Sequence, residues 1–381
     1  MPNFSGVWNL KEQIQAIAAG RWTGLPLYEL YAWGYNGFGR LGDNTTLSKP
    51  SPVQVGDLTT WLQAEAGNTH AAAVKTDGTL WTWGRNVAGS LGQNDLVNRS
   101  SPVQVGALTS WSQVSVGSAH NAAIKFDGTL WTWGDNSPYG QLGDNTVVDK
   151  SSPVQVGALT TWSQTSAGTN HTAAVKTDGA LWTWGSSDSG QLGHGDLTYR
   201  SSPVQVGALT TWYQVSAGNA HTAAIKTDGT LWTWGSNTSG RLADGTVIRR
   251  SSPVQVGNLT DWAQVSTGSQ HGTAVKTDGT LWAWGSNANG QLGDGTIVNK
   301  SSPVQIGALT TWSQTSSGDA HTSAVKTDGT LWAWGSNASG RLGDNTTVDR
   351  SSPVQIGSLT DWYETSAGSS FTIAIVQGQT N

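Results

Sequence analysis

The sequence predicts an all-β protein, a seven-bladed β-propeller whose blades are four-stranded antiparallel sheets. The first observation behind this prediction is a Trp-Gly pair that recurs seven times at steps of 50 or 51 residues, a period typical of propellers and solenoids. The second is that each repeat contains four short β-type runs bounded by turn residues. The third is that the array begins without the first strand of a repeat and ends with such a strand alone. The tryptophans of the seven pairs are Trp33, Trp83, Trp133, Trp184, Trp234, Trp284 and Trp334.

Residues 1–26 precede the repeats and are predicted to form a short N-terminal helix, an anchor segment separate from the propeller at 27–381. Asn9 is a suitable N-cap, and Glu12 stands three residues later in a capping-box arrangement. Three aliphatic residues form one stripe between two flanking tryptophans. The predicted anchor residues are Trp8, Leu10, Ile14, Ile17 and Trp22. Because an isolated helix of this length is marginal in water, the segment is expected to dock on the propeller or on a partner.

The repeat at 221–270 illustrates the four strands expected in each blade. They are HTAAIK at 221–226, TLWTWG at 230–235, SPVQVG at 252–257 and WAQVST at 262–267. Thr227-Asp228-Gly229 predicts a tight hairpin between the first two strands, since Gly tolerates positive φ and Asp caps its own turn. Because small side chains suit a crowded centre, we expect the Ala-rich HTAAIK strand to lie innermost and the Trp-containing strands to pack between blades.

The two ends of the repeat array predict how the ring closes. Residues 27–34 form a TLWTWG-type strand that lacks its preceding partner, and residues 371–376 form an HTAAIK-type strand that lacks its following partner. We therefore expect the N-terminal strand to pair with the C-terminal strand. Such pairing leaves no terminal sheet edge exposed.

The composition excludes several classes of function. The net charge is −5, and no basic patch typical of nucleic-acid binding is visible. No apolar run approaches the ~18–20 residues of a membrane span. The chain has no Cys, which excludes disulfides and thiolate metal sites. The N-terminus lacks the basic and apolar regions of a signal peptide, so classical secretion is not expected.

Candidate catalytic and metal-binding residues are better explained by the repeat. Six histidines recur in register, and Phe371 takes the seventh place. The six are His70, His120, His171, His221, His271 and His321. Because metal ligands converge to ~2.1 Å from one ion, residues spread around a ring are expected to be structural. The glutamates Glu12, Glu29, Glu65 and Glu364 are scattered along the chain, so no carboxylate pair for acid–base catalysis is expected. The prediction is a non-enzymatic protein without a metal or cofactor.

Departures from the repeat are the better candidates for a specific site. They fall in the loops between Gly and His and in the loops after each Trp-Gly pair, one of which is a residue longer and contains Pro138. Tyr and Arg among them are favoured in recognition surfaces, although drift in tolerant loops is the competing interpretation. The predicted binding residues are Tyr35, Phe38, Asn68, Thr69, Arg85, Ser118, Asp135, Tyr139, Asn170, Asp188, Asn219, Gln270 and Asp319.

The repeat motif is G-x-x-H-T-A-A-[VI]-K-T-D-G-T-L-W-x-W-G-S-N-x-x-G-[QR]-L-G. It resembles the repeat of the regulator of chromosome condensation (RCC1-like) family over residues 27–376. The resemblance implies a seven-bladed propeller with a sequence permutation that closes the ring. It implies little about activity, because one fold hosts unrelated functions. Members of the family act through protein–protein surfaces, which implies a protein partner.

The segment from Gly6 to Trp22 resembles a short leader of phage virion and tail-associated proteins, which implies an anchor on a virion. The leading hypothesis is thus a non-enzymatic binding or structural propeller on a phage particle: a tail-associated, fibre or decoration protein that contacts other virion proteins or a host-surface receptor. One alternative is a bacterial protein-interaction or inhibitor module, cytoplasmic or exported by a non-classical route. Another is a carbohydrate-binding propeller with a Trp-lined pocket. The ligand, the binding face and the oligomeric state stay open.

Overall fold

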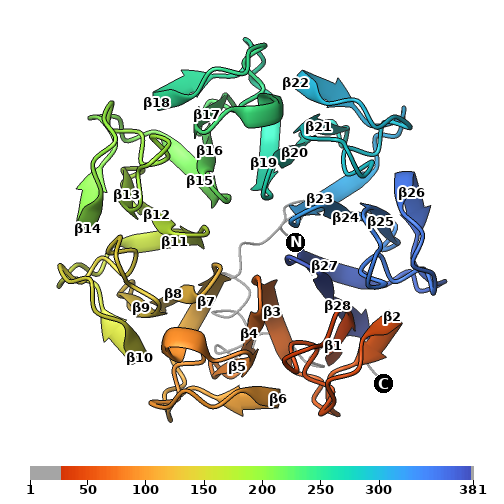
Figure 1. The fold of residues 1–381 in the computed structure, drawn as a ribbon, viewed down its shortest axis with the longest axis horizontal. Coiled ribbons are helices and arrows are strands. Elements are labelled where there is room, and N and C mark those ends of the chain that lie inside the picture. The colour runs from red at the N-terminus through yellow and green to blue at the C-terminus, as the bar shows by residue number, and fades with distance from the viewer. Residues whose placement is uncertain (1–26, 379–381) are drawn as a thin grey trace, which may run out of the picture.

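The computed structural model describes residues 27–378 of the chain. The predicted N-terminal helix and its anchor residues, Trp8, Leu10, Ile14, Ile17 and Trp22, lie outside the described residues. The described residues form seven four-stranded antiparallel sheets arranged as blades around a central axis (Figure 1). The predicted seven-bladed propeller is confirmed.

Each blade is described from the axis outward. Blade I contains β3 (Trp61–Ala66), β4 (His70–Lys75), β5 (Leu80–Gly84) and β6 (Arg99–Gln104). Blade II contains β7 (Trp111–Val116), β8 (His120–Lys125), β9 (Leu130–Gly134) and β10 (Lys150–Gln155). Blade III contains β11 (Trp162–Ala167), β12 (His171–Lys176), β13 (Leu181–Gly185) and β14 (Arg200–Gln205). Blade IV contains β15 (Trp212–Ala217), β16 (His221–Lys226), β17 (Leu231–Gly235) and β18 (Arg250–Gln255).

The remaining blades repeat the same order. Blade V contains β19 (Trp262–Thr267), β20 (His271–Lys276), β21 (Leu281–Gly285) and β22 (Lys300–Gln305). Blade VI contains β23 (Trp312–Ser317), β24 (His321–Lys326), β25 (Leu331–Gly335) and β26 (Arg350–Gln355). Blade VII contains β27 (Trp362–Ala367), β28 (Phe371–Gly378), β1 (Leu27–Gly34) and β2 (Lys49–Gln54). Two short 3-10 turns, η1 (Val87–Gly89) and η2 (Thr238–Gly240), follow the third strands of blades I and IV.

Blade VII closes the ring as the sequence predicted. Its two inner strands come from the C-terminal part of the chain and its two outer strands from the N-terminal part. The strands β1 and β28 pair over eight residues, from Leu27 opposite Gly378 to Gly34 opposite Phe371. Both long edges of β28 are therefore paired, since β27 covers the other side. This pairing removes the exposed edge that an open array would have.

The innermost strand differs from the prediction. The WAQVST-type strand lies at the axis, and the HTAAIK-type strand stands second (Figure 1). The fourth run of each sequence repeat therefore begins the next blade. The physical reason is visible in blade I, where all six residues of β4 are buried, whereas β3 alternates between buried and half-buried residues. The side chains of the second strand are small because Trp rings pack against them, and not because the strand lies at a crowded axis.

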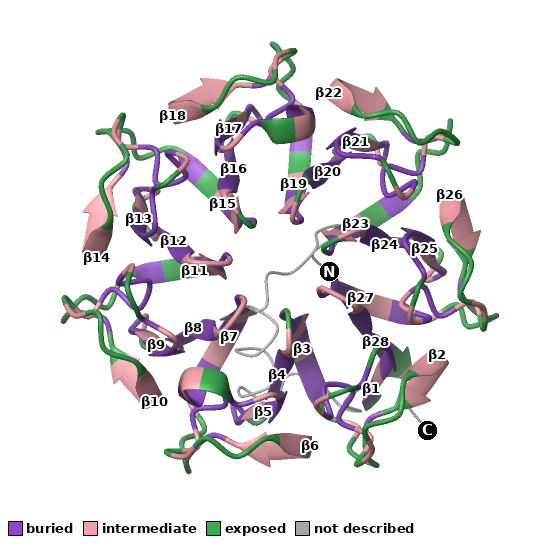
Figure 2. Cartoon of the chain, viewed as in Figure 1, coloured by how far each residue is buried: buried purple, intermediate pink, exposed green. Residues whose placement is uncertain are grey.

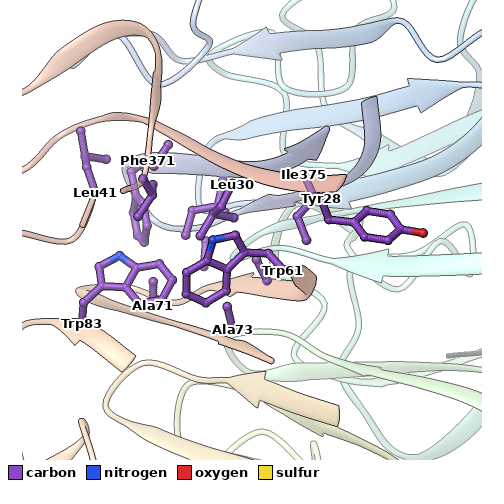
Figure 3. Close-up of a cluster of buried hydrophobic side chains, with 14 residues drawn as sticks. Tyr28, Leu30, Leu41, Trp61, Ala71, Ala73, Trp83, Phe371 and Ile375 are labelled. Atoms are coloured by element: carbon purple, nitrogen blue, oxygen red, sulfur yellow. The ribbon is translucent and has the colours of Figure 1, made fainter. Parts of the chain in front are cut away.

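The core lies in the seams between neighbouring blades (Figure 2). In the seam between blades VII and I, Trp61 and Trp83 pack with Ala71, Leu30 and Phe371 in one buried cluster (Figure 3). A fully buried Trp removes ~150–250 Å² from water, which corresponds to roughly 4–6 kcal/mol of transfer free energy. The seams are therefore held together mainly by apolar burial. They differ from one another in the polar groups that they contain.

Candidate binding face

All thirteen predicted binding residues lie on one face of the propeller. Within a blade the strands alternate in direction, so the loops after the first and third strands emerge on the same side. We call the loops after the first strands the mouth loops; they are 67–69, 117–119, 168–170, 218–220, 268–270, 318–320 and 368–370. We call the loops after the third strands the rim loops; they are 35–48, 85–98, 135–149, 186–199, 236–249, 286–299 and 336–349. Together they make the loop face.

The opposite side, the hairpin face, carries the turns between second and third strands and the connections between blades. Six tight hairpin turns join a second strand to a third strand. Five of them have the sequence Thr-Asp-Gly, and in the sixth Phe126 replaces Thr. The blade connections keep the pattern Gly-x-Leu-Thr in all seven copies. Departures from the repeat are therefore concentrated on the loop face.

The mouth loops surround the axial opening. They and the ends of the first strands line a cavity of about 340 Å³. Four predicted residues lie in this lining: Asn68, Ser118, Asn219 and Asp319. The other three mouth-loop residues that were predicted, Thr69, Asn170 and Gln270, stand one position later in their loops and do not line the cavity. Asp319 is the one charged residue among the described residues of the lining.

The mouth loops are held in place by contacts between blades. Ser118 N donates to Gly168 O at 3.3 Å, and the same bond is made at the next five seams, ending with Ser369 N to Gly67 O at 3.2 Å. Glycine is required here, since a Cβ on Gly117 would lie 2.4 Å from Gly168 O. The mouth is therefore a rigid polar ring. None of the described residues that line it is aromatic, so the Trp-lined pocket expected of a carbohydrate binder is not at the axis.

A cationic patch joins the rim loops of blades VII and I. It consists of Tyr35, Phe38, Arg40 and Arg85. Arg40 Cζ lies 4.7 Å from the Tyr35 ring centroid, and Arg85 Cζ lies 4.9 Å from that of Phe38. Arg40 Nη1 also donates to Asn68 O at 2.7 Å, which ties the patch to the mouth.

Arg40 is a member of this patch that the sequence prediction missed. It is only 3% exposed, and burial together with the charge of Arg85 lowers its pKa to about 10. Arg40 therefore stays charged at neutral pH. It was missed because Arg241 and Arg341 occupy the same repeat position, so Arg40 did not count as a departure.

A tyrosine patch lies on the rim loops of blades II and III. It consists of Tyr139, Tyr199 and Asp188. The two rings meet edge to face with centroids 5.1 Å apart, and Tyr199 Oη donates to Asp188. The hydrogen bond to Asp188 raises the pKa of Tyr199 to about 12. Asp135 lies in the rim loop of Tyr139 and accepts a hydrogen bond from Gln141 Nε2 at 2.8 Å.

The in-register histidines are buried inside the seams. His120 Nε2 lies 3.0 Å from Thr172 Oγ1, and that hydroxyl donates to Gln141 O at 2.8 Å, so the proton between His and Thr belongs to Nε2. Burial lowers the pKa of His120 to about 3 and that of His171 to about 4. No three His, Cys, Asp or Glu side chains come together as a metal site within residues 27–378.

Glu65 and Glu364, two of the glutamates expected to be scattered, interact at the seam between blades VII and I. Glu65 lies on β3 and Glu364 on β27, and burial together with the charge of Glu65 raises the pKa of Glu364. The expectation that the glutamates are scattered was wrong for these two, because ring closure brings together residues about 300 positions apart. The overlooked clue is that Glu65 replaces a Ser and Glu364 a Gln of the repeat.

No helix of the described chain is long and apolar enough to cross a membrane. Comparison with protein families finds the RCC1-like domain over residues 2–271. The Regulator of chromosome condensation (RCC1) repeat matches residues 278–325 and 328–375, and a second model of that repeat matches 262–291 and 312–341. No curated protein sequence matches the chain.

Three solved structures share this fold at TM-scores of 0.83 to 0.84. Human WBSCR16 is 21% identical, with a TM-score of 0.83 over 92% of this chain and 99% of that chain. Prp20p from Saccharomyces cerevisiae, described with its binding properties to Gsp1p and histones, is 18% identical, with a TM-score of 0.83 over 94% and 93% of the two chains. Yeast RCC1 (Prp20) with Kap60 bound is 17% identical, with a TM-score of 0.84 over 100% and 95%. At these identities the likeness is one of fold.

Proposed function

Because this chain belongs to the RCC1-like family, we propose that it is a non-enzymatic propeller that binds a protein partner on its loop face. The observation that carries the proposal is the concentration of departures from the repeat on that face. The hairpin face varies less from blade to blade, at positions such as Asp57, Phe126, Asp261 and Asp361.

The two patches have the chemistry of protein-binding surfaces. The cationic patch combines two guanidinium groups with two aromatic rings, and the tyrosine patch combines two phenol rings with a carboxylate. Tyr and Arg are enriched among the residues that contribute most of the binding energy at protein interfaces. The proteins of similar fold from yeast were described with protein partners, which supports a partner of the same class.

The test is a comparison of partner binding by matched variants. Tyr35→Ala with Arg85→Ala removes two of the four side chains of the cationic patch. Tyr139→Ala with Tyr199→Ala removes both rings of the tyrosine patch. Loss of a hot-spot residue costs roughly 2 kcal/mol or more, so at least one pair is expected to weaken partner affinity more than about 30-fold. Tyr213, 65% exposed beside the hairpin face, provides the control substitution Tyr213→Ala.

The measurement is the dissociation constant of the partner that copurifies with the wild-type chain. We expect Tyr213→Ala to retain wild-type affinity. If both loop-face pairs bind as tightly as the wild type while Tyr213→Ala does not, the partner sits on the hairpin face and the proposal is wrong.

We further propose that the propeller is part of a phage virion, the setting in which residues 6–22 attach it to the particle. It rests on the resemblance of that segment alone. In this setting the partner is another virion protein or a host-surface receptor. A chain without residues 1–26 should then be missing from purified particles that contain the full-length chain, as measured by mass spectrometry. Particles that contain neither form would contradict the setting and leave the loop-face proposal intact.

A further inference from the structure

The first strands of neighbouring blades are joined by a glutamine at nearly every seam. Gln164 Oε1 accepts from Val215 N at 2.8 Å, and its Nε2 donates to Val215 O at 2.9 Å. Gln63 makes the same two bonds to Val114, at 2.9 and 3.0 Å. An amide side chain both donates and accepts, so it matches both polar groups of one backbone residue in the next blade.

Glu364 takes the glutamine position at the seam between blades VII and I. Ala64 is the residue it faces, and Ala64 N donates to the Glu364 carboxyl group. An ionised carboxylate only accepts hydrogen bonds, so it cannot also donate to Ala64 O. A protonated carboxyl group has one acceptor and one donor, and it reproduces the pattern of the glutamine amide.

Glu65 places a second carboxyl group at the same seam. In the other six blades this position is a Ser whose hydroxyl bonds to the next blade, as Ser166 Oγ accepts from Ala217 N at 2.9 Å. Glu65 instead accepts from Ser366 Oγ at 3.2 Å, and that same hydroxyl accepts from Ala66 N at 3.0 Å. Both acids therefore form hydrogen bonds across the same seam, Glu65 to β27 and Glu364 to β3.

No cation among the described residues compensates the pair. Burial raises the pKa of Glu65 to about 7 and holds the pKa of Glu364 well above its usual range. The strands packed against the pair carry several titratable residues. They are Tyr28, Glu29 and Tyr31 of β1, His70 and Lys75 of β4, His321 and Lys326 of β24, and Tyr363 of β27. Lys75 Nζ lies over the Trp81 ring at 4.1 Å, and Glu29 accepts from Tyr31 at 2.9 Å. The strands β7, β23 and β28 contribute no titratable side chain.

We propose that Glu65 and Glu364 form a proton-binding site that acts as a latch between blades VII and I. With protons bound, the seam has the same hydrogen-bond pattern as the glutamine seams. Loss of the protons leaves Ala64 O without its donor and places two negative charges inside the seam. The C-terminal hairpin β27–β28 is then held less tightly against blade I.

The sign of the pH dependence follows from the direction of the pKa changes. Both folded-state pKa values lie above the ordinary value of 4.5. The pair's contribution to stability is therefore fully present below about pH 4.5. It is lost as the pH rises through about 7 for Glu65 and through the raised pKa of Glu364. The latch holds best in mildly acidic conditions.

The test compares Glu364→Gln with the wild type across pH, because contributions from all other groups cancel in the difference. We expect the melting temperature of Glu364→Gln to exceed that of the wild type by about 2 °C or more near pH 8.5, and the advantage to shrink toward about pH 5. Gln164→Glu is the matched control, since it places an acid at the seam between blades III and IV. It should lose stability near about pH 8.5 and little near about pH 5.

A local readout separates the latch from a general change in stability. Amide hydrogen exchange of β3 and β27 should speed up relative to that of β11 and β15 at high pH in the wild type, but not in Glu364→Gln. Glu65→Ser restores the residue of the other blades and should act in the same direction, so the test does not depend on one variant. An advantage that is constant with pH, or absent in both variants, overturns the proposal.

Discussion

At the scale of residues, the seven blades serve as internal controls for one another. In blade IV, Thr230 Oγ1 donates to Asp228 at 2.6 Å and accepts from Trp232 Nε1 at 2.9 Å. Ala180 takes the threonine position in blade III, and the buried Trp182 Nε1 has no hydrogen-bond partner in the described chain. A buried donor without a partner costs stability that the other blades do not lose.

Ala180→Thr is expected to supply that partner. The added hydroxyl accepts from Trp182 Nε1 and donates to Asp178, and the free energy of unfolding should rise by about 1 kcal/mol. Urea denaturation measures the change, and Thr230→Ala, which removes the same bonds from blade IV, should lower stability by a similar amount. If Thr230→Ala lowers the free energy of unfolding and Ala180→Thr does not raise it, the missing hydrogen bond of Trp182 does not limit the stability of blade III.

Residue-scale prediction from the sequence succeeded where a residue breaks the repeat and failed where partners are distant. Tyr35, Phe38 and Arg85 were predicted one by one, but the contact of Arg85 with the Phe38 ring requires two blades to meet. Glu65 and Glu364 each break the repeat as well, yet only the closed ring makes them neighbours. Repeat comparison therefore finds unusual residues and cannot show which of them meet.

At the scale of elements, six of the seven rim loops are braced by a buried asparagine. Asn86 Nδ2 donates to Asp95 O at 2.9 Å, and its Oδ1 accepts from Leu91 N at 2.8 Å. Blade III has Ser187 at this position, and its hydroxyl reaches Asp196 O only at 3.5 Å. The loop that carries Tyr199 is thus the least firmly braced of the rim loops.

Ser187→Asn is expected to brace this loop. The new amide should donate to Asp196 O and accept from Leu192 N, as Asn86 does in blade I. Stability should rise by about 1 kcal/mol, and amide exchange within 188–199 should slow. Asn86→Ser is the reverse control in blade I. Faster exchange in Ser187→Asn would mean that the native loop is held by contacts of Ser187 itself.

The strands themselves were predicted well, but their order within a blade was not. Alternation and turn residues fix where strands such as β16 and β17 occur, because these are local properties of the chain. Which strand lies at the axis depends on packing between blades. The alanines of the second strand are small because Trp rings from both sides cover them, and composition alone does not distinguish that from crowding at a centre.

At the scale of the whole molecule, acid is expected to destabilise the ring. The six seam histidines are buried and neutral, and burial lowers the pKa of His271, for example, to about 3. A lowered histidine pKa means that stability is present above the ordinary value of 6.5 and is lost as the pH falls below it. The expected loss reaches about 2 kcal/mol per histidine near about pH 5.

The urea midpoint at about pH 7.5 and about pH 5 checks this expectation. His120→Gln keeps a donor toward Thr172 without a titratable ring, so its midpoint should fall less on acidification than that of the wild type. Equal changes in both proteins would contradict the role of the histidines. This dependence has the opposite sign to that of the latch, and the two are separable because Glu364→Gln keeps all six histidines.

The mixed origin of blade VII has a consequence for how the protein is made. The strand β1 leaves the ribosome early, whereas its partner β28 is added about 340 residues later. At ~5–20 residues per second, roughly 20–70 s of translation separate the two. During that interval the inner edge of β1 and the apolar side of blade I have no native neighbour, so the nascent chain is most open to mispairing just before its last strand emerges.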